Sequence, residues 1–322
     1  MKLPKTLLAA IVSCCAIAST WAQSYPTRSI RLVVPFSAGG STDLIARITA
    51  EQMRKDLGQV VVVENVGGAA GALGTMQVMN AMPDGYTLLI GTVSTMIVYP
   101  AAHPKPQYSL DNFVPITNIA SMPNVITVNP KFPANNLTEF VQLLKANPDK
   151  YSYATSGVGS INHMLGESFQ AYSGTKLIHV PYKGSGPAMQ DVIGGQVDIL
   201  FDQFPSSKNM IDGGKLKGVG AITPQKVPGY PNLMTMEDAG MKGFTDEAWY
   251  GLLAPAKTPP EVIARLTDAM KKTMANPELR KKLEDIGSRP VGSTPQEFAA
   301  QVRSEIDKMK KIVTSRNIKL QE

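Results

Sequence analysis

Two turns rich in glycine and hydroxyl residues constrain this chain more than any other feature. One spans residues 35–43 and the other residues 154–163, and each follows a short apolar run and leads into a helical pattern. The start of a helix offers unpaired backbone N–H groups and the positive end of the helix dipole, so it attracts anions. Two such turns, far apart in the sequence, predict two anion-binding jaws.

The first residues have the pattern of an export signal. Lys2 and Lys5 flank the start of an apolar run that is too short to span a bilayer, and small residues precede a cleavage point after Ala22. Residues 1–22 are therefore a predicted signal peptide. Residues 11–14 also resemble a bacterial lipoprotein cleavage box, which would leave a lipid anchor on Cys14. Because the apolar run continues past Cys14, cleavage after Ala22 is the preferred interpretation.

Composition narrows the class of the exported chain. Its roughly 300 residues fit two domains, and Cys14 and Cys15, the only cysteines, both lie in the predicted signal. The formal net charge of +6 is spread over helical patterns that also carry acids, which argues against nucleic-acid binding. A mildly positive surface favours small anions.

Strand and helix patterns alternate along most of the chain. The alternation over residues 30–91 and 151–201 predicts α/β architecture with a parallel sheet, and the last part turns helical from Pro260. Extended stretches at 125–130 and 248–255 are expected to cross between two lobes. We predict lobe one as residues 23–123 plus 246–322 and lobe two as residues 124–245, with hinge closure around a ligand.

Five segments carry a family resemblance. The runs at residues 25–43, 83–87, 181–188, 194–202 and 249–255 together resemble Bug-type proteins, the extracytoplasmic solute receptors of tripartite tricarboxylate transporters. The resemblance implies a periplasmic two-lobed "Venus flytrap" with a mainly parallel sheet flanked by helices in each lobe and two crossing strands as the hinge. It also implies capture of a small carboxylate and delivery to inner-membrane permease subunits. Residues 65–71 depart from the family pattern, because Asn65 is not followed by the arginine and proline often found there in the family.

The first jaw is expected to hold one carboxylate through backbone N–H groups and the Ser41 hydroxyl. The alternative is an ordinary strand-to-helix turn in which Ser41 or Thr42 caps the helix, and Asp43 complements the helix dipole. The first-jaw candidates are Phe36, Ser37, Ala38, Gly39, Gly40 and Ser41.

The second jaw is expected to hold a second carboxylate or a carbonyl. His163 lies about one helical turn beyond Ser160, so its side chain either faces the opening of the second jaw or has a structural role. The second-jaw candidates are Ser156, Gly157, Val158, Ser160 and His163.

Three further candidates lie outside the jaws. Ser94 follows a predicted strand, in competition with Thr92 and Thr95, where a parallel sheet offers its crevice to ligands. Asp202 follows another strand and either reaches an amino group, a protonated carboxyl or a water in the cleft, or caps lobe two. Phe204 either sandwiches a planar ligand with Phe36 or packs in the core, and Trp249 is a hinge or ligand residue.

A hydrolase and a sensor receptor are the alternative functional classes. A hydrolase triad of Ser156 or Ser160 with His163 and Asp202 is conceivable, but no nucleophile elbow, zinc-protease motif or phosphate loop is present. We expect no enzyme activity, cofactor or metal, and a monomer. A receptor that docks a membrane sensor kinase has the same sequence features as a transport receptor. Di- and tricarboxylates, acidic amino acids and aromatic carboxylates all fit the two jaws.

Overall fold

The computed structural model describes residues 25–231 and 233–315. The predicted signal peptide and its alternative lipid site at Cys14 lie outside these residues. Within the described chain, none of the helices has the length and apolar character needed to cross a membrane.

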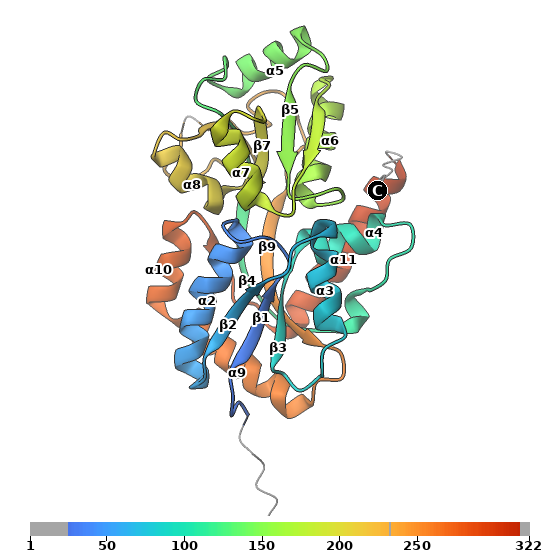
Figure 1. Cartoon of the computed structure of the whole chain (residues 1–322), viewed down its shortest axis with the longest axis vertical. Coiled ribbons are helices and arrows are strands. Elements are labelled where there is room, and N and C mark those ends of the chain that lie inside the picture. The colour runs from blue at the N-terminus through green and yellow to red at the C-terminus, as the bar shows by residue number, and fades with distance from the viewer. Residues whose placement is uncertain (1–24, 232, 316–322) are drawn as a thin grey trace, which may run out of the picture.

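Ten strands form one continuous sheet that runs the length of the molecule (Figure 1). The strands are β1 (Ile30–Val34), β2 (Val61–Asn65), β3 (Thr87–Thr92), β4 (Phe113–Val128), β5 (Ser152–Thr155), β6 (Ile178–Pro181), β7 (Ile199–Gln203), β8 (Lys217–Ile222), β9 (Glu247–Pro255) and β10 (Arg289–Pro290).

Helices cover both faces of this sheet. They are α2 (Ser41–Leu57), α3 (Ala72–Met79), α4 (Tyr99–Ala102), α5 (Leu137–Ala146), α6 (Ile161–Ser173), α7 (Ser185–Gly194), α8 (Phe204–Asp212), α9 (Pro260–Ala275), α10 (Pro277–Asp285) and α11 (Pro295–Ser315), with short turns η1 (Ala69–Gly71), η2 (Ser94–Val98) and η3 (Leu110–Asn112).

The molecule has two halves that share β4. The lower half in Figure 1 holds β1–β3, β9, β10, residues 113–123 of β4 and helices α2–α4 and α9–α11. The upper half holds β5–β8, residues 124–128 of β4 and helices α5–α8. The strand changes partners between Pro123, which pairs with Glu247, and Asn124, which pairs with Gln203. The change of partner places the two halves end to end.

Strand pairing follows the alternation in the sequence. β1 pairs in parallel with β2 and β3, and β5 pairs in parallel with β6 and β7. The pairs made by β4 and β9 are antiparallel. Parallel strands end at the same edge of a sheet, so the turns after β1 and β5 lie at the carboxyl edges of their half-sheets. Those edges face each other at the junction of the halves.

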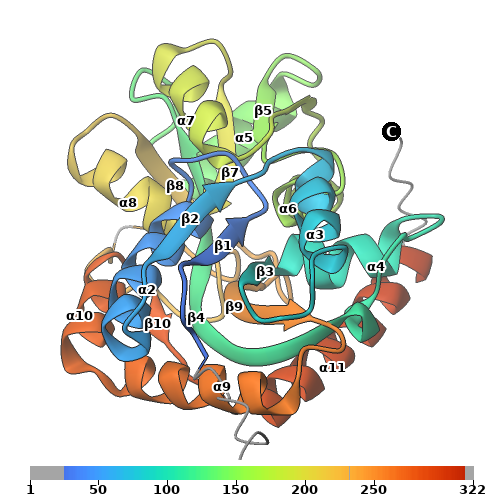
Figure 2. The same ribbon diagram turned by 60° about the horizontal axis from the view of Figure 1, so that its bottom comes forward.

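Apolar residues on both sheet faces explain why β1 is buried. Ile30, Leu32 and Val34 point to the face covered by α2, α9 and α10, whereas Val33 belongs to the cluster on the opposite face. Alternate side chains of a strand point to opposite faces, so a strand covered on both sides is mostly apolar. The exception is Arg31 near the start of β1, which is exposed and pairs with Glu64 (2.7 Å). On the second face α11 inserts Phe298, which is fully buried, and packs on α4 and β4 (Figure 2).

Candidate functional site

The first jaw joins β1 to α2. The residue before the helix is Gly40, in extended backbone, and no side chain of the described residues caps the helix there. Ser41 and Thr42 therefore do not act as caps. Asp43 accepts a hydrogen bond from the Gly39 N–H (3.1 Å) and pairs with Arg47 (2.9 Å). The N–H groups of the first turn of α2 are consequently available to an anion.

Ser41 connects the first jaw to the opposite half of the molecule. Its hydroxyl lies 2.7 Å from the hydroxyl of Ser206 on α8, and the Ser206 N–H donates to the Ser41 oxygen (2.9 Å). Ser206 in turn donates to the Asp202 carboxylate (2.5 Å). A hydroxyl has one hydrogen to donate. Either Ser206 or the Gln203 carbonyl oxygen, 3.3 Å away, can receive the single Ser41 hydrogen, and Ser206 donates to Asp202.

Ser37 and Gly186 bring the halves into direct contact. The N–H and hydroxyl of Ser37 both lie 3.2 Å from the carbonyl oxygen of Lys183, to which they donate. Gly186 lies so close to Ala38 that a Cβ on this glycine would come within 2.1 Å of the Ala38 carbonyl oxygen. Gly39 also faces Gly186, at ordinary van der Waals distance. The predicted first-jaw residues Ala38 and Gly39 thus lie where the two halves touch.

The second jaw joins β5 to α6. Ser160 is the N-cap of α6, and its hydroxyl oxygen accepts from the His163 N–H (3.2 Å). Ser94, from the lower half, accepts from the Ile161 N–H (3.0 Å). A side chain of one half therefore already supplies an oxygen to the helix N-terminus of the other. Gly157 adopts a positive φ of 126° and approaches Ala70 across the junction, which explains the need for glycine at this position.

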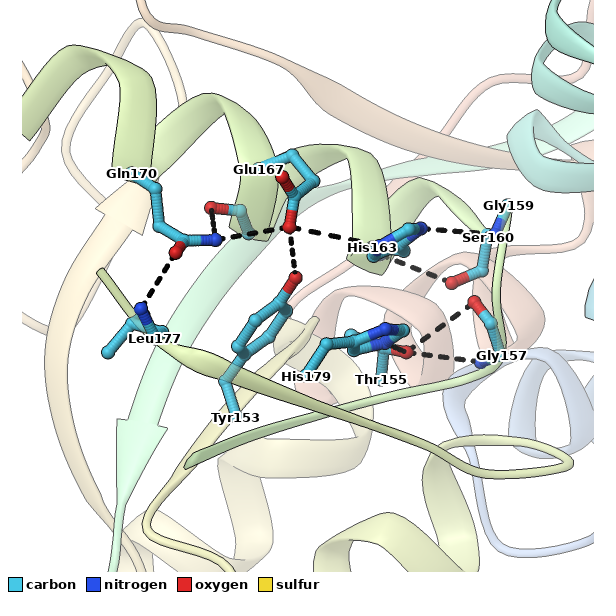
Figure 3. Close-up of polar contacts among 11 residues, drawn as sticks. Tyr153, Thr155, Gly157, Gly159, Ser160, His163, Glu167, Gln170, Leu177 and His179 are labelled. Atoms are coloured by element: carbon cyan, nitrogen blue, oxygen red, sulfur yellow. Dashed lines mark hydrogen bonds and ion pairs between the residues drawn. The ribbon is translucent and has the colours of Figure 1, made fainter. Parts of the chain in front are cut away.

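His163 and His179 support the second jaw from behind (Figure 3). Their rings stack with centroids 4.1 Å apart, and the Gly159 N–H donates to His163 Nδ1 (3.2 Å). Thr155 Oγ1 lies 2.7 Å from His179 Nε2. Burial lowers the pKa of His163, and it lowers the pKa of His179 to about 4, with the neighbouring ring adding to the effect. A neutral His163 can accept the Gly159 hydrogen.

A small cavity lies where the two jaws meet. Its volume is about 20 Å³, enough for roughly one water molecule. Six predicted site residues line it, namely Phe36, Ser37, Gly40, Ser41, Ser94 and Ser156. Ten further residues line it, namely Thr42, Thr92, Val93, Ile161, Asn162, Ser185, Gln203, Ala248, Trp249 and Tyr250.

A buried amide network forms the back of this cavity. Gln203 donates to the side-chain oxygens of Asn162 (2.8 Å) and Asn124 (3.1 Å), and Tyr250 donates to Gln203 Oε1 (3.2 Å). These residues come from β4, β7, β9 and α6, so the network ties the crossing strands together. Sequence reasoning missed Gln203 and Tyr250, although both belong to predicted strands, or to their ends, near the crossing point. The position of Gln203 and Tyr250 near the end of a predicted strand is the feature of the sequence that indicates a place in the site.

Asp202 and Phe204 lie behind the cavity lining rather than in it. Asp202 is fully buried and accepts from Ser206 and from Ser207 (3.2 Å). Phe204 is also fully buried, packs edge-on against Tyr230 and belongs to a cluster of the upper half. The structure therefore brings Phe36, but not Phe204, to the cavity. The stacked pair His163 and His179 is likewise not part of its lining.

A wider groove of about 860 Å³ opens beside the cavity. Ser37 lines both spaces, and Gly157 and Val158 line the groove only. The other walls come from η1, α3 and α4 below and from the turn around Lys183 above. Ser156 of the second jaw thus lines the closed cavity, whereas Gly157 and Val158 of the same jaw line the open groove.

The groups that line the cavity are ones that can bind an anion. Its donors are backbone N–H groups, hydroxyls and amides, which bind a carboxylate by direction rather than by charge. Among residues 25–231 and 233–315, no group of three His, Cys, Asp or Glu side chains is placed to hold a metal ion. Ser160, His163 and Asp202 do not assemble as a hydrolase triad, since Asp202 bonds Ser206 and Ser207 instead of either histidine.

Comparisons with known proteins find similar sequences and structures. The family model "Tripartite tricarboxylate transporter family receptor" matches residues 45–318. BugT of Bordetella pertussis is 32% identical over 301 residues, covering 93% of this chain and 92% of that protein. The structure of the periplasmic binding protein BugD matches with a TM-score of 0.89 and 36% identity, covering 92% of this chain and 100% of that chain.

Two further solved structures contain carboxylates. Rpa4515 of R. palustris, solved with adipate, matches with a TM-score of 0.87 and 30% identity, covering 92% of this chain and 99% of that chain. MatC (Rpa3494) from Rhodopseudomonas palustris, solved with bound malate, matches with a TM-score of 0.85 and 33% identity, covering 90% of this chain and 100% of that chain. The fold is the mixed α/β fold of periplasmic binding proteins.

Proposed function

This chain belongs to the tripartite tricarboxylate transporter family of receptors, and from that premise we propose that it captures a small carboxylate between its two halves and delivers it to the membrane permease of such a transporter. The family is one of binding proteins and not of enzymes. A serine-hydrolase function is therefore set aside.

One observation carries the proposal. Helices α2 and α6 come from opposite halves, and the jaws at their N-termini line one small cavity with hydroxyl and amide groups. Two helix N-termini that converge in this way favour an anion with two acceptor ends. The adipate and malate of the two relatives are anions of this kind.

Closure between the halves is the second part of the proposal. We take residues 23–123 plus 246–322 as one lobe and 124–245 as the other, with movement about Pro123 and Asn124 of β4 and about the chain that enters β9 at Glu247. The direct bonds of Ser41 and Ser37 to the opposite half hold a closed form. Its cavity of about 20 Å³ is too small for a dicarboxylate, so the ligand binds with the halves further apart than they are here. An anion that binds both jaws favours closure only as far as it binds the closed form more tightly.

We also propose the chemical class of the ligand and the cellular location of the receptor. Phe36 lines the cavity beside Trp249 and Tyr250, whereas Phe204 does not, so a planar ligand between Phe36 and Phe204 loses its support. We favour aliphatic dicarboxylates because two relatives were solved with adipate and malate. Removal of residues 1–22 would release the receptor into the periplasm, where relatives of this family act.

A thermal-shift screen tests the proposal. The chain from Gln23 onward, freed of co-purified ligand by unfolding and refolding, is heated with malate, adipate, citrate, aspartate and terephthalate. Ligand far above its Kd should stabilise the protein by about 2–4 kcal/mol and raise Tm by several degrees. Mass spectrometry should recover the acid unchanged. No shift with any acid would overturn the carboxylate assignment.

A further inference from the structure

Asp202 has an unusual position for an acidic residue. Its side chain is fully buried at the junction of the halves, on β7, opposite Val125 of β4. Oδ2 accepts from Ser206 and Ser207, but Oδ1 is buried and makes no hydrogen bond within the described residues. A buried carboxylate oxygen without a partner is costly to hold as an anion.

No cation compensates the Asp202 carboxyl among the described residues. On the elements packed around it, Asp43 of α2 pairs with Arg47, and Lys208 of α8 pairs with Asp212. On α7, Asp191 accepts a bond from Tyr182, and the Tyr250 phenol of β9 carries a raised pKa and stays neutral. On α6, Glu167 accepts from Tyr153. Burial raises the pKa of Asp202, and the hydrogen bonds from neighbouring serines oppose that rise only in part.

The first jaw is connected to this carboxyl through two hydroxyl groups. Ser41 lies 2.7 Å from Ser206, which lies 2.5 Å from Asp202 Oδ2. A ligand carboxylate at the first jaw would therefore be a negative charge close to a second one. Two carboxyl groups that share a dry site favour a proton on one of them.

We propose that closure around a carboxylate ligand is coupled to uptake of one proton by Asp202. The proton comes from the solvent while α2 is away from α8, and it is held once Ser41 covers Ser206. The neutral carboxyl then lets a site without a cation accept an anion. This inference rests on the proposed function, because it needs a carboxylate in the first jaw.

Titration calorimetry in two buffers of different ionisation enthalpy measures the coupling. Wild-type protein from Gln23 onward is titrated at pH 7–8 with malate and with adipate, whose carboxyl groups are then ionised. We expect uptake of up to one proton per ligand and an affinity that falls as the pH rises, by at most tenfold per unit.

The Asp202→Asn variant should abolish the coupling without abolishing binding. Asparagine has the shape of the neutral carboxyl, still accepts from Ser206 and does not titrate, so its affinity should be independent of pH. Asp198→Asn is the matched control, since Asp198 precedes the same strand and bonds Ser152 away from the cavity. Asp246→Asn controls for the other acid whose pKa burial raises, to about 7. Both controls should keep wild-type uptake.

The outcomes separate the inference from the proposed function. Binding without proton uptake in the wild type, or unchanged uptake in folded Asp202→Asn, would overturn the inference and leave the receptor intact. No binding of any acid would overturn the proposed function and this inference with it.

Discussion

The hydroxyl groups of Ser41 and Ser206 lie 2.7 Å apart although the two residues are 165 positions apart in the chain. Ser41 begins α2 in the lower half and Ser206 lies in α8 of the upper half. A polar contact this short, with Ser41 almost fully buried, forms only when the halves are closed. The same hydroxyl that we assign to the ligand thus also joins the two halves.

Replacing Ser41 by alanine should weaken ligand binding. The change removes one buried hydroxyl from the first jaw and its contact with Ser206, and a hydrogen bond contributes about 1 kcal/mol. We expect Kd to rise roughly five- to tenfold in calorimetric titration. Ser152→Ala, which removes a 3.0 Å bond to Asp198 far from the cavity, should leave Kd unchanged. An unaltered Kd in Ser41→Ala would contradict the assignment of this hydroxyl.

Gly186→Ala should prevent closure while the protein stays folded. The new Cβ would lie 2.1 Å from the Ala38 carbonyl oxygen, whereas alanine itself favours the helix by about 1 kcal/mol. We expect at least a tenfold loss of affinity and no ligand-induced decrease in the radius of gyration by small-angle X-ray scattering. Gly194→Ala, at the other end of α7 with nothing within 4 Å of its Cβ, is the control and should bind as the wild type does.

Lowering the pH should decrease the free energy of unfolding because of the stacked histidines His163 and His179. The pKa of His179 falls from 6.5 to about 4 on folding. Between these values the unfolded chain binds more protons, so stability decreases as the pH drops from 6.5 to 4. His179→Gln, which does not titrate, should show a smaller decrease in Tm over this interval. Identical pH profiles for His179→Gln and the wild type would exclude His179 as the cause.

Phe204→Leu should affect stability rather than ligand affinity. Phe204 packs on Tyr230 in the core of the upper half and does not line the cavity. Loss of ring volume from a packed site should cost roughly 1–2 kcal/mol of unfolding free energy, measured by urea denaturation. A large change in Kd for an aromatic acid, with stability preserved, would instead restore the sandwich of Phe36 and Phe204.

Local patterns predicted the elements around the jaws because each has its own strong signal. The turn before α2, the start of a helix near Ser160 and the proline start of α11 are properties of short segments. Residues 113–123 of β4 were not predicted as a strand, and they contain Pro115 and Pro123, residues that strands disfavour. The structure accommodates Pro115 next to an irregularity in the pairing with β9.

Contacts between distant segments explain the part of the site that sequence reasoning could not reach. Nothing local indicates that Ser41 meets Ser206, that Ser94 bonds Ile161, or that Gln203 joins Asn162 and Tyr250. These pairs depend on how the halves close. The placement of His163 against His179, rather than in the cavity, depends in the same way on the pairing of β5 with β6.

A crystal structure of the protein with bound malate or adipate would locate the ligand relative to the two jaws. We expect the halves to be closed around it and a ligand carboxylate to lie within about 2.7–3.2 Å of first-jaw N–H groups and of the Ser41 hydroxyl, with the other end at the second jaw. A ligand seated instead in the groove beside Leu73 and Tyr182, or outside the junction altogether, would contradict this expectation.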